Sequence, residues 1–378
     1  MSARQQTGPA LRVLMTADAV GGVWQYALDA AEGMRSHGVE TILAVLGPSP
    51  SKDQLDRART NGIEVIDTGL PLDWTAGQAG EVAAAGQAIA QLAAEIRPDI
   101  VHLNSPALLA DGSFPCPVVA MCHSCVATWW ESVRGGPLPE AFAWRTELIR
   151  KGYRAADMLL APTAAFAHAT ARFYDLADVP TVVRNGRRPV RGEAPRTREL
   201  FAFTAGRLWD DGKNFAAFDR AASRLSIPAL AAGPLGGPNG AQIAAHHATA
   251  LGRLSDQEVA GYLSAQPIFV SAAKYEPFGL AVLEAAQAGC ALVLSDIPTL
   301  RELWDGAALY VTPDDDGALA RSIGRLSADE TMRRAMGETA RERAGAYSVG
   351  AMSAGILSAY RSLLPSKVGF ISLKGAAA

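Results

Sequence analysis

The sequence contains few cysteines and histidines, with 4 and 6 respectively in 378 residues. Four cysteines are too few for a disulfide framework in a chain of this length, so the fold has to depend on hydrophobic cores. Charge of either sign is not in excess, because 35 basic and 38 acidic side chains give a formal net charge of −3. This balance excludes a protein that holds nucleic acid through bulk positive charge.

Long apolar runs are absent as well. No uninterrupted apolar segment approaches the roughly 20 residues that a membrane-spanning helix requires. Residues 1–10 are polar and lack the apolar region of a secretory signal, so we expect a cytoplasmic protein. With 49% hydrophobic and 19% charged residues, the composition is that of a globular protein long enough for two domains.

The apolar segments that are present alternate between strand-like and helix-like patterns. Strands are predicted at 11–17, 40–46, 63–67, 100–103, 117–122, 158–161, 181–184, 201–204, 228–232, 267–270, 291–295 and 308–311. Helices are predicted at 23–33, 51–61, 82–96, 139–154, 257–264 and across most of 318–360. This alternation predicts an α/β protein with parallel sheets, in which ligands bind beyond the carboxyl ends of the strands.

The arginine- and proline-rich stretch 187–198 is predicted to be a polar linker between two domains. We expect an N-terminal domain over 1–188, a C-terminal domain over 199–346, and a final helix with a tail over 347–378. No G-x-G-x-x-G fingerprint occurs in either predicted domain, which argues against a dinucleotide-binding site of that type.

The stretch 273–288, AKYEPFGLAVLEAAQA, is the most indicative of function. It follows a predicted strand and should enter a helix near Pro277, because proline favours the first helical position. Glu276 then lies in the loop and Glu284 about two turns further on, so both carboxylates can line one elongated ligand. Backbone amides between them suit an anion at a helix N-terminus; they belong to Phe278, Gly279 and Leu280.

Other candidate positions lie where predicted strands end. The turn Gly21-Gly22 follows the first strand and opens a helix, which is a phosphate site in principle. His123 follows the strand 117–122, and Arg207 and Lys213 follow the strand 201–204. Taken singly, each feature has an ordinary structural explanation: a tight turn, a buried histidine, or loop cations.

The segment Cys122-His123-Ser124-Cys125 requires a metal or redox site to be considered. Cys116 is the only further ligand nearby, and Cys122 and His123 should point to opposite faces of a strand. We therefore favour buried thiols over a metal site.

Together these motifs resemble glycosyltransferase family 4, whose members are retaining enzymes with the GT-B fold of two Rossmann-like domains facing a cleft. The resemblance extends over about 11–364 and rests on Gly-Gly-Val, Gly-Arg-Leu…Lys and Glu-x7-Glu in the expected order. It implies that the N-terminal domain lies on the acceptor side, that the C-terminal domain binds the nucleotide-sugar donor, and that the final helix, around 347–364, crosses back onto the N-terminal domain. It also implies that Glu276 binds hydroxyls of the donor sugar and that Glu284 binds the ribose. Further implied donor contacts come from Gly21, Gly22, Arg207, Lys213, Arg253, Phe278, Gly279 and Leu280.

The resemblance also implies a reaction, with His123, Arg207, Lys213 and Glu276 as the catalytic set. A sugar would move from a UDP-, GDP- or ADP-linked donor to a hydroxyl of a glycan, lipid-linked or small-molecule acceptor, as in bacterial polysaccharide or glycoconjugate synthesis. No cofactor or metal is expected, because no Asp-x-Asp pair occurs where this family would need one. An epimerase or phosphorylase of the same fold, or a non-catalytic nucleotide-sugar-binding module, stays open.

Contact with a membrane surface stays open as well. The predicted helix 139–154 carries basic residues on one side, which could meet anionic lipid on the cytoplasmic face of the inner membrane. A solvated helix face is the more common explanation of such a pattern.

Overall fold

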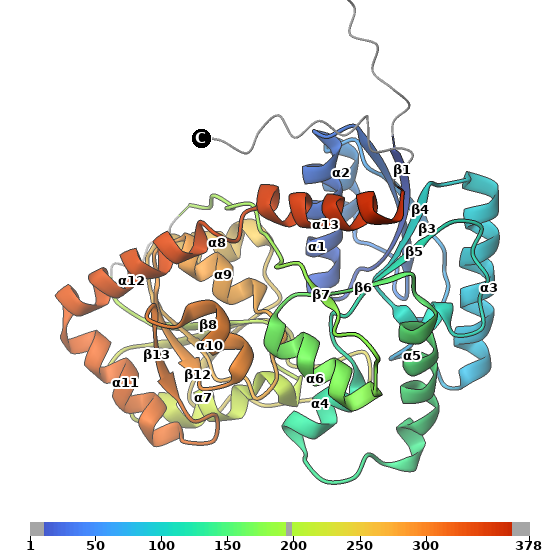
Figure 1. Cartoon of the computed structure of the whole chain (residues 1–378). Helices are drawn as coiled ribbons and strands as arrows, with labels where there is room; N and C mark the ends of the chain where they lie inside the picture. The colour runs from blue at the N-terminus through green and yellow to red at the C-terminus, as the bar shows by residue number, and fades with distance from the viewer. Residues whose placement is uncertain (1–10, 194–198, 365–378) are drawn as a thin grey trace, which may run out of the picture.

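The computed structural model describes residues 11–193 and 199–364 and shows two α/β units side by side (Figure 1). The first contains β1 (Leu11–Asp18), α1 (Gly22–Arg35), β2 (Val39–Leu46), α2 (Lys52–Thr60), β3 (Glu64–Asp67), α3 (Ala79–Ile96), β4 (Ile100–Leu103), η1 (Pro106–Leu109), β5 (Val118–Met121), α4 (Val126–Val133), η2 (Glu140–Phe142), α5 (Ala143–Ala155), β6 (Met158–Ala161), α6 (Ala164–Tyr174) and β7 (Thr181–Val182).

The second unit begins at β8 and ends at α12. Its elements are β8 (Ala202–Ala205), η3 (Asp211–Lys213), α7 (Phe215–Ala222), β9 (Ala229–Ala232), β10 (Thr249–Gly252), α8 (Asp256–Ser264), β11 (Ile268–Ser271), α9 (Leu280–Gln287), β12 (Ala291–Ser295), α10 (Pro298–Trp304), β13 (Ala308–Val311), α11 (Asp316–Ala328) and α12 (Glu330–Ala344). The last helix is α13 (Val349–Leu363).

Both sheets are parallel, as the alternating pattern predicts. The strand order is β3-β2-β1-β4-β5-β6-β7 in the first unit and β10-β9-β8-β11-β12-β13 in the second. In each sheet the order reverses beside the unit's first strand, between β1 and β4 and between β8 and β11. A crevice opens at such a reversal beyond the carboxyl ends of the strands, so the loops after β1 and β8 are placed to meet a ligand.

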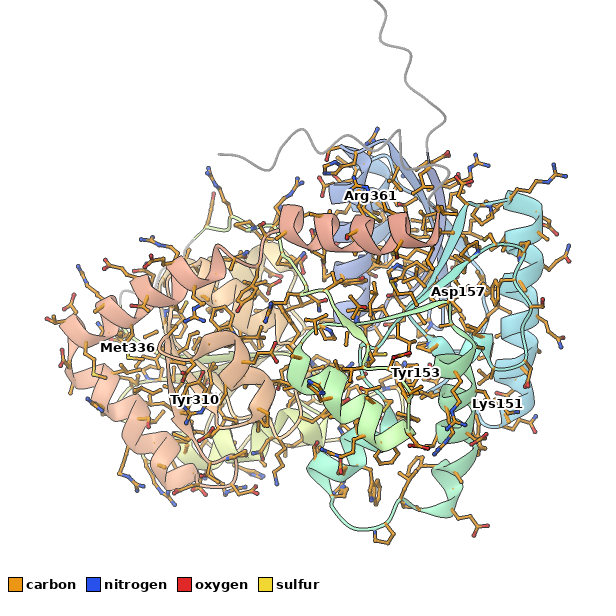
Figure 2. The ribbon with its side chains drawn as sticks, viewed as in Figure 1. Lys151, Tyr153, Asp157, Tyr310, Met336 and Arg361 are labelled. Atoms are coloured by element: carbon orange, nitrogen blue, oxygen red, sulfur yellow. The ribbon has the colours of Figure 1, made fainter. Side chains whose placement is uncertain are left out.

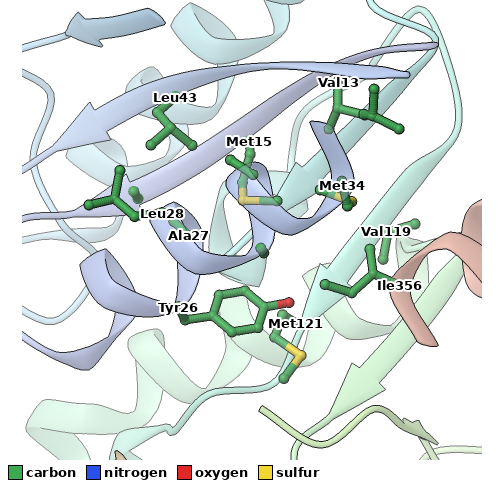
Figure 3. Close-up of a cluster of buried hydrophobic side chains, with 14 of the residues drawn as sticks. Val13, Met15, Tyr26, Ala27, Leu28, Met34, Leu43, Val119, Met121 and Ile356 are labelled. Atoms are coloured by element: carbon green, nitrogen blue, oxygen red, sulfur yellow. The ribbon is translucent and has the colours of Figure 1, made fainter. Parts of the chain in front are cut away.

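The final helix, α13, returns to the first unit. In Figure 1, α13 (red) crosses in front of α1 of the first unit. Met352, Ile356 and Leu357 are buried in the core around β1, and Figure 3 shows Ile356 in one cluster with Val119 and Met121. The helices approach closely at Gly33, where a Cβ would lie 2.1 Å from Ser353 Oγ.

Two local predictions are wrong in detail, and two helices were not predicted. Helix α9 begins at Leu280 instead of near Pro277, because Gly279 takes a left-handed φ of 91° that a helix cannot contain. The helix predicted at 139–154 is divided into η2 and α5. Helices α4 and α6 were not predicted, although Thr163 caps α6 by accepting from the amide of Phe166.

The basic residues of α5 make contacts within the protein. Arg150, Lys151 and Arg154 pair with Glu147, Asp111 and Asp175, and Arg145 donates to the carbonyls of Asp73 and Ala76. Figure 2 shows the region around Lys151 and Tyr153; Lys151 is exposed, whereas Tyr153 is buried in the core. Within the described residues, no helix is long and apolar enough to cross a membrane.

Candidate functional site

A cleft open to solvent lies between the two units where β1, β5, β8 and β11 end. Every position that the sequence predicted for the site lines this cleft: Gly21, Gly22, His123, Arg207, Lys213, Arg253, Glu276, Phe278, Gly279, Leu280 and Glu284. The structure therefore brings together residues from both units that lie far apart in the sequence.

The Gly21-Gly22 turn lies directly against the second unit. Asp18, the last residue of β1, fixes the turn by accepting hydrogen bonds from the amide of Val20 at 3.0 Å and from that of Gly21 at 3.3 Å. A Cβ on Gly21 would lie 3.2 Å from Arg207 Nη1, and one on Gly22 would lie 3.3 Å from Leu280 Cδ1. Because these contacts are tighter than ordinary packing, glycine lets the backbone approach the opposite wall of the cleft.

His123 lies at the carboxyl end of β5 as a neutral ring. Its Nε2 is 2.7 Å from Asn104 Oδ1, while the Asn104 amide nitrogen donates to the carbonyl of Thr16 at 2.6 Å. This assigns the proton to Nε2 and leaves Nδ1 as an acceptor. Burial lowers the pKa of His123 to about 3, so the ring is a weak base suited to accepting a hydrogen bond from a hydroxyl.

Two cations at the end of β8 are held by carboxylates of the same unit. Lys213 Nζ lies 2.5 Å from Glu276 Oε2, and Arg207 Nη2 lies 2.9 Å from Asp210 Oδ2. Burial alone would raise the pKa of Asp210, but Arg207 and Lys213 outweigh burial and the pKa is lowered. Arg207 Nε is buried and has no partner among the described residues.

The backbone between the two glutamates offers donors to the cleft. Within the described residues, the amides of Phe278, Gly279 and Leu280 donate to no protein acceptor. Leu280 is the first residue of α9, so its amide belongs to the positive end of that helix, whereas the other two lie in the preceding turn. Together with Arg207 and Lys213, these donors make the middle of the cleft suited to an anion.

Glu284 has a partner that the sequence did not reveal. Arg187 was predicted to belong to a polar linker, yet its side chain is only 1% exposed. Its Nε lies 2.5 Å from Glu284 Oε1, its Nη1 2.8 Å from Asp29 Oδ2, and its Nη2 3.1 Å from Asp256 Oδ2. The guanidinium therefore joins α1 of the first unit to α8 and α9 of the second.

A second arginine joins the same cluster. Arg57 of α2 binds Asp256 at 2.5 Å, and Gln25 donates to the other oxygen of Asp256 at 3.4 Å. Burial raises the pKa of Glu284, and Arg187 opposes that effect. The end of the cleft beside Glu284 is thus closed by ion pairs between the two units.

The other end of the interface is closed by α4. Trp129 Nε1 donates to Asp210 Oδ1 at 3.0 Å, and Arg134 forms an ion pair with Asp211. Tyr275 precedes Glu276 in the chain, and its hydroxyl lies 2.8 Å from Thr128 Oγ1. Contacts between the units therefore flank the cleft on both sides.

The cysteines of the Cys-His-Ser-Cys segment are buried thiols. Cys122 is fully buried, and Cys125 Sγ lies 3.0 Å from Thr128 Oγ1. In the part of the chain that the structure describes, no group of three or more histidine, cysteine, aspartate or glutamate side chains could hold a metal ion.

Comparisons with known proteins match this architecture along nearly the whole chain. Residues 20–191 match the family model described as Glycosyltransferase Family 4, and residues 242–343 match that of Glycosyl transferases group 1. A glycogen synthase of Mycobacterium tuberculosis is 25% identical over 371 residues, covering 86% of each chain.

Solved structures share the fold at lower identity. Sucrose-phosphate synthase from Thermosynechococcus elongatus is 17% identical with a TM-score of 0.76, covering 94% of this chain and 100% of that one. Anabaena HepE, solved in complex with UDP and glucose, is 17% identical with a TM-score of 0.71, covering 93% and 100%. With its two parallel sheets, its interdomain cleft and the matches to both family models, the chain belongs to the GT-B glycosyltransferases.

Proposed function

We propose that this enzyme is a retaining glycosyltransferase that moves a sugar from a nucleoside diphosphate to a hydroxyl of a glycan. The observation that carries the proposal is the cleft itself, in which cations, free amides and carboxylates of the second unit face the glycine turn and His123 of the first. Two similar proteins support the substrate class, since one is a glycogen synthase and another was solved with UDP and glucose.

The diphosphate is assigned to the middle of the cleft. Arg207, Lys213 and the amides before α9 supply donors there, and charge-assisted hydrogen bonds contribute on the order of 1.5–3 kcal/mol each. Their attraction increases as the bond between the sugar and the diphosphate breaks, because the leaving group gains negative charge. In this proposal that positive charge makes a divalent metal unnecessary.

The sugar is assigned to the space between Glu276 and His123. Glu276 accepts hydrogen bonds from sugar hydroxyls after Lys213 turns to the diphosphate, and Nδ1 of His123 accepts another. The anomeric carbon loses its bond to the diphosphate oxygen and gains one to the acceptor oxygen on the same face. The acceptor proton passes to the leaving phosphate, so no protein nucleophile or base is required.

The ribose is assigned to Glu284. Arg187 occupies Oε1, which leaves Oε2 of a cleft-lining carboxylate for the ribose hydroxyls. Arg253 and the loop after β10 lie at the same end and form the place for the base.

A thermal-shift screen against UDP-, GDP- and ADP-sugars tests the proposal. A donor present at about 100 times its Kd should stabilise the folded protein by about 2.7 kcal/mol, and Glu284→Gln should reduce that effect. The stabilising donor is then incubated with glucan oligosaccharides, and the anomeric configuration of the product is read by NMR. No stabilisation by any nucleotide-sugar would refute the donor class, and an inverted product would refute retention.

A further inference from the structure

Helix α4 of the first unit contacts the loop that carries the two cations of the second. Trp129 donates its indole N–H to Asp210 at 3.0 Å across the interface, and Arg134 of the same chain segment pairs with Asp211. Trp129 is half-buried and does not line the cleft. Its hydrogen bond to the site is made to Asp210.

Asp210 organises both cations that we assign to the diphosphate. Its Oδ2 accepts from Arg207 at 2.9 Å, and its Oδ1 accepts from the amide of Gly212 at 2.9 Å. The second bond caps the short helix η3, whose last residue is Lys213. The position of one carboxylate, itself only 8% exposed, thus sets the direction of Arg207 and the start of the turn that presents Lys213.

The packing around this carboxylate leaves little freedom. A Cβ on Gly212 would lie 2.7 Å from Trp129 Nε1 and 3.0 Å from Asp210 Oδ1. The indole therefore reaches Asp210 only because residue 212 has no side chain. Opening the interface would remove one of the two donors from Oδ1, since Trp129 belongs to the other unit.

We propose that Trp129 is a positioning residue, which on domain closure binds Asp210 and thereby fixes Arg207 and Lys213 toward the donor diphosphate. The inference rests on the proposed function, because it takes the diphosphate as the ligand of these cations. It adds that the electrostatic machinery of the second unit is completed by a side chain of the first. Donor cleavage then depends on closure, and an open enzyme has less capacity to hydrolyse its donor in water.

The matched pair Trp129→Phe and Trp130→Phe tests the inference. Both changes shrink a ring on α4 and remove an indole N–H, but Trp130 Nε1 is buried without a partner among the described residues. The diphosphates and monophosphates of uridine, guanosine and adenosine are titrated into each variant by calorimetry. Preference for the diphosphate over the monophosphate should fall about tenfold in Trp129→Phe, the size expected from a charge-assisted bond, and should stay near wild type in Trp130→Phe.

The outcomes distinguish failure of the inference about Trp129 from failure of the proposed function. Wild-type protein that binds no nucleotide, or shows no preference for a diphosphate, refutes the proposed function. A wild-type preference that Trp129→Phe retains in full refutes the inference alone. Equal weakening of both nucleotides, together with a lower unfolding temperature, assigns Trp129 a merely structural role and also overturns the inference. Gly212→Ala is a second probe, because it displaces the indole without removing a polar group.

Discussion

Replacing Arg187 with glutamine should destabilise the protein strongly. The side chains of Arg187 and Asp29 are each only 1% exposed, and their ion pair spans 2.8 Å. Asp29 Oδ1 already lacks a partner among the described residues. Glutamine would therefore leave a buried carboxylate without its ion pair, which costs about 3–5 kcal/mol in comparable cases. For a unit of this size, that loss corresponds to a fall in Tm of roughly 6–20 °C.

Urea unfolding of matched variants measures this effect. Arg188→Gln is the control, because Arg188 is the next residue and its side chain, which pairs with Glu32, is 56% exposed. That change should cost no more than about 1 kcal/mol. The double variant Arg187→Gln with Asp29→Asn should be more stable than the sum of the single changes predicts, because neither partner then remains as an unpaired buried charge.

Two results would refute the reasoning about the Arg187 cluster. The first is an unfolding free energy of Arg187→Gln within about 1 kcal/mol of that of Arg188→Gln. The second is full additivity of the Arg187 and Asp29 changes, which would mean that the two side chains do not depend on each other.

Glu284→Gln should weaken binding of the bare nucleoside diphosphate, whereas Glu276→Gln should spare that binding and lower turnover; equal losses of affinity in calorimetry would contradict these roles. Arg207→Ala and Lys213→Ala should each lower initial rates by about 10²-fold or more, as expected from losing about 3 kcal/mol of transition-state stabilisation, and near-normal rates in both would exclude the diphosphate assignment. Burial lowers the pKa of His102 to about 3, so between pH 6.5 and 3 the unfolded chain binds a proton that the folded chain does not. The contribution of neutral His102 to the free energy of unfolding is complete above pH 6.5 and declines as the pH falls, by up to about 2 kcal/mol at pH 5. Urea midpoints measured at pH 7 and pH 5 should therefore differ less in His102→Gln than in wild type.

The positions of the site residues could be predicted because they follow strand patterns. Short apolar runs mark the strands, and the residues immediately after them must emerge at the carboxyl edge of a parallel sheet. Gly21, His123 and Arg207 were identified in this way, and all of them line the cleft. A local pattern suffices there, because strand and loop are adjacent in the sequence.

The contacts between the units could not be predicted, because their partners are distant in the chain. Arg187 is 158 positions from Asp29, and Trp129 is 81 positions from Asp210. Nothing near Arg187 marks it as buried, since the stretch is polar and contains proline like any linker. Helix α4 was missed for another reason: two tryptophans, two valines and a threonine in VATWWESV give low helix propensity, and tertiary packing overrides it.

Two of the contacts between the units join groups that we assign to donor binding. Arg187 binds Glu284, which we assign to the ribose, and at the same time binds Asp29 of the opposite unit. Asp210 holds Arg207, which we assign to the diphosphate, and accepts from Trp129 of the opposite unit. Two polar bridges between the units thus end on side chains that position groups we assign to the donor. A donor that holds those groups in place therefore also favours the closed arrangement of the units, because the two sets of contacts share the same atoms.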